Sequence, residues 1–505
     1  MILSDGQKQA GAGVVVLGAG PAGLTAAYLL AQQGRRVAVL EADPKYVGGI
    51  SRTVRYKGFH FDVGGHRFFS KSERVEQFWR EILPNDFLER PRSSRIYYRG
   101  RFFSYPLRAF EALIKLGVLE SARCVLSYGK ARIRQIHPVR SFEDWVVNQF
   151  GRRLFQIFFK TYTEKVWGMD CKEISADWAA QRIKGLSLGT AIWRAIFPRK
   201  AGSGSAGNGP VIKSLIDTFH YPRKGPGMMW EACAEKIRAL GGSIHMGCCA
   251  ERLEYSSETG KWRVHYRSDH GEKVEWLEAD EVISSAPLRE VVLMIQPLMS
   301  PAARRAAESL KYREFMTVIL ILKGREPFAD NWIYIHDPKV KVGRIQNFKS
   351  WSPEMVPDPA FGCYGLEYFC FAGDALWKTA DQELIELAKR EFAQLGLAEP
   401  AAVVDGCVVR QAKAYPVYDD EYGSNVKVIR DEIEGRHPSL HLVGRNGMHK
   451  YNNQDHAIMT AMLTVENILA GRKRHDVWAV NQDAEYIEVG SDSDQAVFET
   501  RPPQT

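Results

Sequence analysis

The residues with the greatest capacity for chemistry lie late in the chain, in the stretch GRNGMHKYNNQDHAIMT at residues 444–460. A Gly444-Arg445 turn is followed by polar side chains at 451–456 and then directly by an apolar helical pattern. The first amides of a helix have no partner within it, and they attract negative charge. The stretch therefore predicts a site for an anionic or amide-rich group, with Arg445 placed to contact a phosphate. The alternative is a polar segment that only caps the helix, through Asn453 or Asp455.

The N-terminal stretch VVVLGAGPAGLTAAYLLAQQGRRVAVLEAD, at residues 14–43, has the pattern of a nucleotide-binding unit. Residues 14–17 predict a buried strand, a helix then runs to Gly34, and residues 36–40 predict a second strand that finishes on Glu41. Glycines in the turn allow a tight bend, close approach of a pyrophosphate and close packing of helix on strand. Glu41 is placed to accept hydrogen bonds from ribose hydroxyls. A glycine-rich turn alone could be structural, but the complete unit predicts dinucleotide binding.

Two further glycine pairs follow in VGGISRTVRYKGFHFDVGGHRFFS, at residues 47–70. Taken singly, Gly48-Gly49 and Gly64-Gly65 are typical of hairpin turns, although each also lets backbone approach a cofactor closely. Two such turns directly after the acidic residue resemble flavoproteins of the amine-oxidase and glutathione-reductase type, in which the first pair lies under the flavin diphosphate. The resemblance favours FAD over NAD. The helix start at 453–455 would then satisfy the oxygens of the flavin pyrimidine ring.

Bulk composition limits the class of protein. The chain has 505 residues, ordinary hydrophobic (45%) and charged (25%) content, and a net charge of +8. The charge is not gathered into a basic tract, which disfavours nucleic acid as a partner. The eight cysteines show no CxxC and no metal-ligand spacing, so we expect reduced thiols, no metal and a cytoplasmic protein. No apolar run reaches about 18 residues, so no transmembrane segment is predicted, and the patterns do not predict an oligomeric state.

These patterns, with the flavoprotein resemblance, predict an α/β protein. Its Rossmann-like FAD-binding domain is expected to be assembled from discontinuous segments, with inserted helical and mixed-sheet substrate domains. The boundaries that we expect are FAD-binding parts at 13–75, 215–292 and 431–475, a mainly helical substrate and lid domain at 76–214, an antiparallel-sheet substrate domain at 293–430, and a loosely packed tail at 476–505.

Four separated stretches resemble UDP-galactopyranose mutases, particularly the eukaryotic-type enzymes: FDVGGHRFFS, TYTEKVWGMDCKEISADWAAQR, NWIYIHDPKVKVGRIQNFKSWSP and GRNGMHKYNNQDHAIM. With the N-terminal unit they run from about residue 14 to residue 470. The resemblance implies noncovalent FAD that is active when reduced. Flavin N5 attacks the anomeric carbon of a nucleotide-diphosphate sugar, and a pyranose becomes a furanose without net redox. NAD(P)H stays open as the reductant.

The same resemblance assigns roles to residues. The catalytic set contains His66, beside the flavin, with Arg182 and Arg344, which grip the diphosphate as planar, bidentate cations. The substrate-binding set contacts diphosphate, nucleotide or sugar: Phe158, Trp167, Tyr334, Tyr415, Tyr451 and Asn453. The cofactor-binding set surrounds the FAD: Gly18, Gly20, Ala22, Gly23, Glu41, Gly48, Gly49, Gly65, His66, Gly444, Arg445, Asn453 and Gln454.

Each type of side chain also has a structural interpretation. A single His is more often a satisfied structural residue and an Arg more often a solvated charge, while Trp167 and Phe158 could equally pack in a core. The chain departs from the eukaryotic-type pattern at Tyr97, where an arginine is expected, and at Ile216 and Asp217, near an expected nucleotide-contacting asparagine. The flavin and diphosphate elements therefore match better than the nucleotide and sugar elements.

Other reactions share this FAD architecture, namely oxidation or desaturation as in amine oxidases and protoporphyrinogen oxidases, and redox epimerisation of a sugar. The flavin requirement discriminates between them, because a mutase needs prior reduction whereas an oxidase reduces its own flavin on adding substrate. The Gly/Ser-rich residues 201–210 suggest a lid at 183–210 that becomes ordered when a diphosphate binds Arg182. A surface insertion without a role is the alternative.

Overall fold

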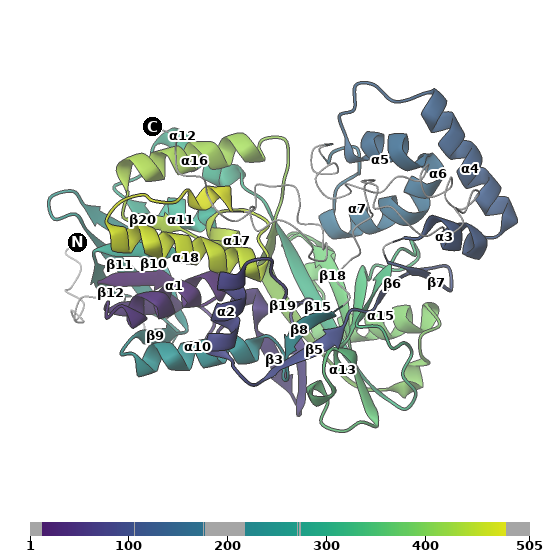
Figure 1. The fold of residues 1–505 in the computed structure, drawn as a ribbon, viewed down its shortest axis with the longest axis horizontal. Coiled ribbons are helices and arrows are strands. Elements are labelled where there is room, and N and C mark those ends of the chain that lie inside the picture. Colours follow the sequence, from purple (N-terminus) through teal and green to yellow (C-terminus); the bar gives the residue numbers. More distant parts are fainter. Residues whose placement is uncertain are drawn as a thin grey trace, which may run out of the picture.

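The computed structural model describes residues 13–105, 107–174, 176, 218–269, 271 and 274–480. Arg182, Ile216, Asp217, the proposed lid at 183–210 and the tail beyond residue 480 lie outside the described residues. Figure 1 shows a Rossmann-like part at one end of the molecule, a strongly twisted sheet in the middle, and a group of helices at the other end.

The Rossmann-like part is built on a parallel sheet of five strands in the order β20-β13-β1-β2-β9. The strands are β1 (Val14–Leu17), β2 (Val37–Glu41), β9 (Ser243–Met246), β13 (Glu281–Ser284) and β20 (Leu440–Leu442). Strands adjacent in this sheet come from the beginning, the middle and the end of the chain. The predicted α/β class, with a discontinuous domain, is therefore confirmed.

The continuous apolar run of β1 is explained by burial on both faces of the sheet. Val14 and Val16 pack with three helices, α1 (Pro21–Gln32), α10 (Gly227–Ala239) and α18 (Gln454–Ala470). Val15 and Leu17 pack on the opposite layer. That layer contains the strands β10 (Cys248–Ser256), β11 (Lys261–Ser268), β12 (Val274–Ala279) and β14 (Ile295–Gln296), and the helices α11 (Leu288–Met294), α12 (Pro301–Ser309) and α16 (Tyr422–Arg436).

The second sheet has seven strands in the order β19-β15-β18-β17-β16-β6-β7. They are β6 (Ser94–Tyr98), β7 (Arg101–Ser104), β15 (Tyr312–Lys323), β16 (Trp332–Ile335), β17 (Arg344–Asn347), β18 (Phe361–Cys370) and β19 (Val403–Pro416). All neighbours are antiparallel except β16 and β6, so the sheet is mixed. Helix α15 (Asp381–Gln394) packs against it.

Three strands interrupt the segment that the sequence led us to expect as mainly helical. Besides β6 and β7, β5 (Phe87–Pro91) pairs with β8 (Thr218–Pro222). Alternation explains the strands of the large sheet, because Ile96 and Tyr98 face the helical core while Tyr97 faces the sheet core, where its hydroxyl donates to the Leu395 carbonyl. The arginines that flank these three residues, Arg95 and Arg99, obscured the period of two.

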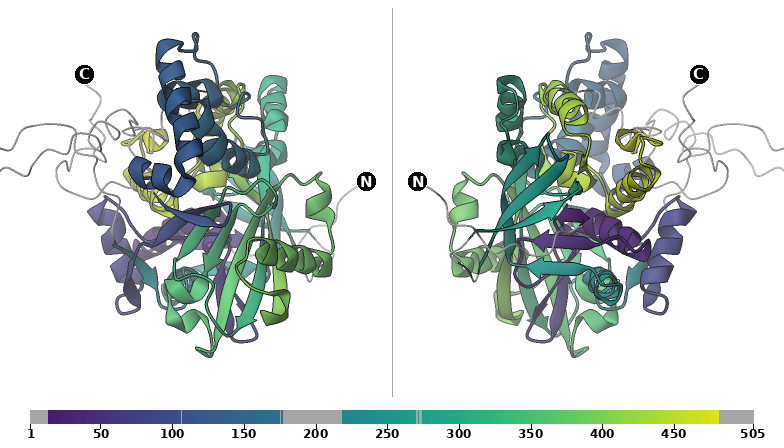
Figure 2. Two further views of the ribbon diagram at one scale, coloured as in Figure 1. Left: turned by 90° about the vertical axis from the view of Figure 1, so that its right-hand side faces the viewer. Right: turned by 90° about the vertical axis from the view of Figure 1, so that its left-hand side faces the viewer.

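The helical part comprises α3 (Ala109–Leu116), α4 (Val118–Ile133), α5 (Phe142–Phe150), α6 (Arg152–Phe155), a π-helical turn (Gln156–Lys160) and α7 (Thr161–Trp167). Helix α5 begins with a capping box in which Ser141 Oγ accepts from the Asp144 amide at 3.1 Å. The buried faces of these helices, with β6 and β7, form one hydrophobic core. Figure 2 shows this part projecting beyond the seven-stranded sheet.

The remaining elements join these parts. They are β3 (Thr53–Tyr56), β4 (Phe59–Asp62), α2 (Glu73–Ile82), α13 (Phe348–Trp351), α14 (Ala375–Lys378) and α17 (Gly444–Gly447), with short 3-10 turns at Gly49–Ser51, Pro353–Met355, Pro400–Ala402 and Val477–Ala479. Among the residues described, no helix has the length and apolar character needed to cross a bilayer.

Candidate functional site

A cavity of about 530 Å³ lies where the Rossmann-like part meets the seven-stranded sheet. Its volume is in the range of small-molecule and cofactor sites. Its walls come from eight segments of the chain, namely residues 17–22, 40–42, 49–51, 64–69, 248–250, 285–294, 411–415 and 444–457, together with Arg344. The N-terminal glycine turn and the late polar stretch therefore share one cavity.

Backbone in the N-terminal turn closely matches what a diphosphate requires. Gly18, Gly20 and Ala22 line the cavity, and a Cβ on Gly49 would lie 3.3 Å from the Cα of Gly20. Gly23 does not line the cavity. It faces the turn instead, since a Cβ there would lie 1.9 Å from the carbonyl oxygen of Gly18. Gly23 thus lets α1 pack on the turn, while the other glycines leave room for the ligand.

Glu41 lies at the end of β2 and lines the cavity. Its carboxylate accepts hydrogen bonds from the Ala19 amide at 2.6 Å and the Asp43 amide at 2.8 Å. Burial raises the pKa of this carboxyl, and the two amide hydrogen bonds oppose that shift. The amides fix the orientation of the carboxylate, and its remaining lone pairs can accept from ribose hydroxyls.

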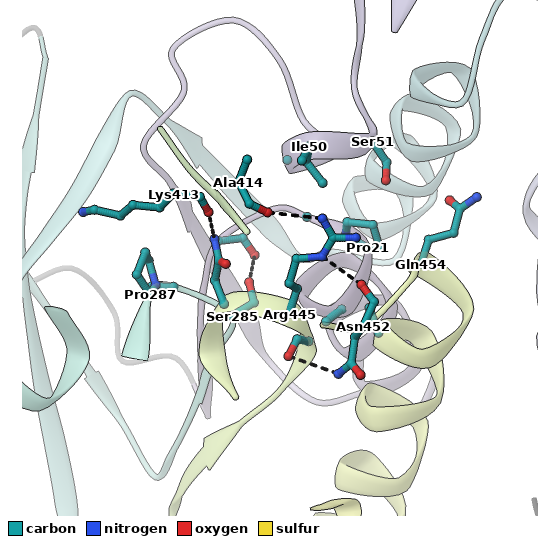
Figure 3. Close-up of a pocket in the computed structure, with 18 of the residues that line it drawn as sticks. Pro21, Ile50, Ser51, Ser285, Pro287, Lys413, Ala414, Arg445, Asn452 and Gln454 are labelled. Carbon is teal, nitrogen blue, oxygen red and sulfur yellow. Dashed lines mark hydrogen bonds between the residues drawn. The ribbon is translucent and has the colours of Figure 1, made fainter. Parts of the chain in front are cut away.

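Arg445 is held more firmly than the sequence indicated. Its Nε donates to the Asn452 carbonyl at 2.8 Å and its Nη1 to the Ala414 carbonyl at 3.2 Å, as Figure 3 shows. The guanidinium carbon lies 5.2 Å from the ring centre of Tyr415 and 5.0 Å from that of Tyr451. Arg445 therefore supports the two tyrosines and joins β19 to the polar loop before α18, besides lining the cavity.

The start of α18 forms the opposite wall. Asn453, Gln454 and Asp455 line the cavity, and the Asn453 amide donates to His456 Nδ1 at 3.3 Å. The Gln454 amide nitrogen donates to the Arg67 carbonyl at 2.9 Å, whereas its buried Oε1 has no hydrogen-bond partner in the described part of the chain. The positive end of the helix dipole and the unused Gln454 acceptor suit the carbonyls and the N–H of the flavin pyrimidine ring. The residues present therefore fit FAD.

His66 lies in the cavity wall directly after Gly65. Its Nε2 is 3.0 Å from the Val63 carbonyl, which can only accept, so Nε2 carries the proton. Nδ1 is 3.4 Å from Ser51 Oγ. Burial lowers the pKa of His66 to about 4, and the charges of Arg445 and Arg344 act in the same direction. His66 is therefore neutral at pH 7.

Arg344 projects from β17 into the same cavity. Its Nε donates to Glu367, a fully buried carboxylate on β18 that also accepts from Gln346 Nε2 at 2.9 Å. Burial raises the pKa of Glu367, and the Arg344 charge opposes the shift. Within the described residues, the side chain of Arg344 donates a hydrogen bond only to Glu367. The pair keeps a guanidinium charged and oriented where an anionic ligand would bind.

Aromatic rings surround Arg344. Tyr415 and Tyr451 line the cavity and stack with 5.6 Å between ring centres and 14° between planes. Tyr334 faces Arg344 across the β16–β17 pair. The partly buried Tyr162, which the sequence did not single out, meets Tyr334 edge-on with 5.3 Å between ring centres.

The structure does not bring every predicted residue to this cavity. Phe158 packs in the helical core against Phe103 with 5.1 Å between ring centres, which supports its structural interpretation. Trp167 is buried at the end of α7 in the same core and reaches Tyr451, with ring centres 6.3 Å apart. Gly48, which has a left-handed backbone, and Tyr334 are adjacent to lining residues without lining the cavity themselves.

A second cavity, of about 370 Å³, lies at the edge of the seven-stranded sheet. Its lining is basic and hydroxylic: Arg92, Ser93, Ser94, Arg95, Ser104, Tyr105, Arg108, Ala329 and Asp330. Arg95 pairs with Asp330 through both carboxylate oxygens, and the Arg92 guanidinium lies 5.5 Å from the ring centre of Tyr105. The Tyr105 ring is 4.8 Å from that of Tyr334, so this cavity adjoins the Arg344 end of the first.

Comparison with known families decides the classification. Residues 21–468 match the flavin containing amine oxidoreductase family, which covers both walls of the main cavity. The chain belongs to this family. Membership makes this protein an FAD-dependent enzyme and assigns FAD to the cavity whose residues fit it.

The relatives of this chain differ in activity. A dTDP-fucopyranose mutase of Escherichia coli is 29% identical over 32% of this chain and 44% of its own length. L-amino-acid oxidases of rattlesnakes match over more of the chain: bordonein-L of Crotalus durissus terrificus is 24% identical over 62% of this chain and 58% of its own length, and an oxidase of Crotalus adamanteus is 46% identical over 61% and 57%. The chain spans about half the length of the curated relatives that it matches.

Among solved structures, a reduced UDP-galactopyranose mutase shares the fold. The TM-score is 0.77 at 22% identity, and the superposition covers 94% of this chain and 98% of that one. Identity at this level establishes the fold of this protein but not its reaction. The predicted likeness to the mutases within a wider amine-oxidase group is therefore confirmed as a likeness of fold.

Proposed function

We propose that the protein is a flavin-dependent mutase that interconverts the pyranose and furanose forms of a nucleotide-diphosphate sugar. A continuous basic and aromatic track supports the proposal. It runs from Arg344 in the FAD cavity, past Tyr334 and Tyr105, to the second cavity at Arg92 and Arg108. Guanidinium groups suit phosphate oxygens and aromatic rings suit a base or ribose. The guanidinium groups and aromatic rings of the two adjoining cavities suit a nucleotide diphosphate better than a small substrate.

Each part of the cavity has a role in this reaction. Reduced FAD, bound noncovalently, supplies N5 as the nucleophile. Arg344 holds the diphosphate and neutralises its charge as it leaves the sugar. Tyr415 and Tyr451 cover the sugar and exclude water, which would otherwise hydrolyse it. His66 contributes a neutral imidazole, so it adds no competing positive charge beside Arg344.

The reductant and the compartment belong to the same proposal. We propose NAD(P)H as the reductant, entering by the main cavity, because the GxGxxG turn at residues 18–23 is already part of the FAD site. The cytoplasmic location is supported by the eight cysteines, all of which are free thiols. Arg182, outside the described residues, is proposed as the second diphosphate-binding arginine.

The second candidate is oxidation of an amino acid. The observation that favours it is the match to the L-amino-acid oxidases over a larger part of the chain than the match to the mutase. Arg344 would then bind the substrate carboxylate, and the second cavity at Arg92 and Arg108 would have no ligand to contact. That unused basic cavity is the reason to place this candidate second.

Product analysis separates the two candidates. The protein, reduced with dithionite without oxygen, is given UDP-galactopyranose or dTDP-fucopyranose, and sugar nucleotides are resolved by chromatography. Furanose should form with the reduced protein and not with the oxidised one. A parallel arm supplies L-amino acids in air and measures hydrogen peroxide, which should be absent. Peroxide with an amino acid, and no furanose from either sugar nucleotide, would replace the first candidate by the second.

A further inference from the structure

The helices α3 and α4 carry a surface that the proposed reaction does not use. Of the thirteen large apolar side chains exposed in the described part of the chain, six lie on these two helices or at their junction. They are between 46% and 90% exposed: Ile114, Val118, Leu119, Val125, Leu126 and Ile133. An apolar patch of this kind on a folded protein marks an interaction surface.

The spacing of these side chains makes one stripe along α4. Leu119, Leu126 and Ile133 follow at seven-residue steps and therefore lie nearly in line on the helix, with Val118 and Val125 beside them. The opposite face of α4 is the one that packs in the helical core, where Cys124 is 1% and Ala131 is 6% exposed. Folding of this part of the chain thus buries one face of α4 and leaves the apolar stripe outward.

Basic residues border the stripe on both edges. At about 100° per residue, Arg123 and Lys130 fall beside Leu119, and Arg132 falls on the other edge beside Val125. All three basic side chains are exposed. The one acidic residue of the helix, Glu120, is already paired with Arg153 and Arg123. Lys130 on one edge and Arg132 on the other therefore give the stripe a positive border on each side.

This charge pattern decides between two occupants. A second copy docked through the stripe would bring two sets of basic edges together, which costs electrostatic energy. An anionic bilayer accepts the apolar stripe among its acyl chains and the arginines and lysine among its phosphates. We propose that the α3–α4 face binds the surface of an anionic phospholipid membrane.

The position of the face allows this without obstructing the site. Helix α4 lies at the end of the molecule farthest from the parallel sheet, and Figures 1 and 2 show it on the outer side of the helical part. The helix rests on the membrane and does not cross it, since no described helix is long and apolar enough to span. Attachment is reversible and weakens as salt screens the basic edges. It does not depend on which flavin reaction the protein catalyses.

Vesicle flotation of the full-length, FAD-loaded protein tests the proposal. Vesicles of phosphatidylcholine with 30% phosphatidylglycerol are compared with pure phosphatidylcholine at low and high salt. The wild type should float with the anionic vesicles only and be released by salt. The double variant Leu126→Glu, Ile133→Glu should bind the anionic vesicles at least about tenfold more weakly than the wild type. The double variant Lys130→Gln, Arg132→Gln should also bind them at least about tenfold more weakly. Leu240→Glu, which changes an exposed leucine on another surface, is the matched control and should bind normally.

Several results would overturn the proposal. One is that the wild type does not float with anionic vesicles. Another is that the control and the α4 variants lose vesicle binding equally. A third is that the α4 variant has half the molecular mass of the wild type in solution while its vesicle binding is unchanged. The last result would assign the stripe to a second copy. FAD absorbance and melting temperature of each variant establish that it is folded, and a variant that fails this check is replaced by Leu126→Asn, Ile133→Asn.

Discussion

The buried pair of Arg344 and Glu367 allows the binding role of Arg344 to be separated from its structural role. Replacing Arg344 by Met leaves Glu367, which is fully buried, with one hydrogen bond from Gln346 and no countercharge. Breaking a buried pair in this way costs roughly 3–5 kcal/mol, because the remaining charge is desolvated without compensation. Loss of nucleotide binding in Arg344→Met would therefore be ambiguous, since the variant is also destabilised.

The double variant Arg344→Met, Glu367→Gln removes this ambiguity. Both charges are gone, and a glutamine amide can still bond to Gln346, so stability should return to within about 1–2 kcal/mol of the wild type. If Arg344 binds the diphosphate, the recovered protein should still bind UDP at least tenfold more weakly, since a charge-assisted bidentate contact contributes about 1.5–3 kcal/mol.

Urea unfolding measures the stability arm and calorimetric titration of UDP measures the binding arm. Arg325→Met, at an exposed arginine in the bend that follows β15, is the control and should change neither. A double variant that is stable and binds UDP as tightly as the wild type would refute the role assigned to Arg344. A single variant as stable as the wild type would refute the coupling of the pair.

Three other substitutions test the account. Gly23→Ala should lose FAD, read as the ratio of flavin to protein absorbance, because its Cβ would lie 1.9 Å from the Gly18 carbonyl oxygen, whereas Gly435→Ala has open space and should keep it. Lys165 Nζ donates to three carbonyls between residues 335 and 342, so Lys165→Met should destabilise the protein by about 3 kcal/mol and weaken UDP binding through the β16–β17 hairpin; full stability in urea would contradict this. Burial lowers the pKa of His336 to about 3, so in the wild type the unfolded state takes up a proton as pH falls below about 6.5, while the folded state does not. The free energy of unfolding of His336→Phe should therefore rise by about 3 kcal/mol relative to that of the wild type between pH 7 and pH 4. A difference that stays constant with pH would contradict the assignment.

The parts of the fold that could be predicted are those whose signal is local. β1, α1 and Glu41 follow from an apolar run, a glycine turn and one acid, and the structure has them within a few residues of the predicted positions. The strands β5 to β7 were missed because a seven-stranded sheet takes β6 by pairing it with β16, more than 230 residues away. The pattern of residues within 87–104 carries no information about a strand so distant in the sequence.

The site shows the same division. Gly18, Gly65, Arg344 and Gln454 were predicted and line one cavity. Glu367 was not singled out, because a lone acid in a strand gives no sign that it will be buried against an arginine 23 residues earlier. The resemblance pointed to Phe158 as a base-stacking residue, and the structure places it in a core. An aromatic side chain in a helix has the same appearance in the sequence in both cases.

The most direct test of the mutase proposal is a count of product molecules per electron pair. The protein is reduced without oxygen by one equivalent of dithionite per flavin, separated from reductant, and incubated with UDP-galactopyranose or dTDP-fucopyranose in the absence of any electron acceptor. A redox-neutral mutase regenerates its reduced flavin, so many furanose molecules should form per flavin while the flavin stays reduced. One product or fewer per flavin, or reoxidation of the flavin in step with product formation, would contradict the proposal.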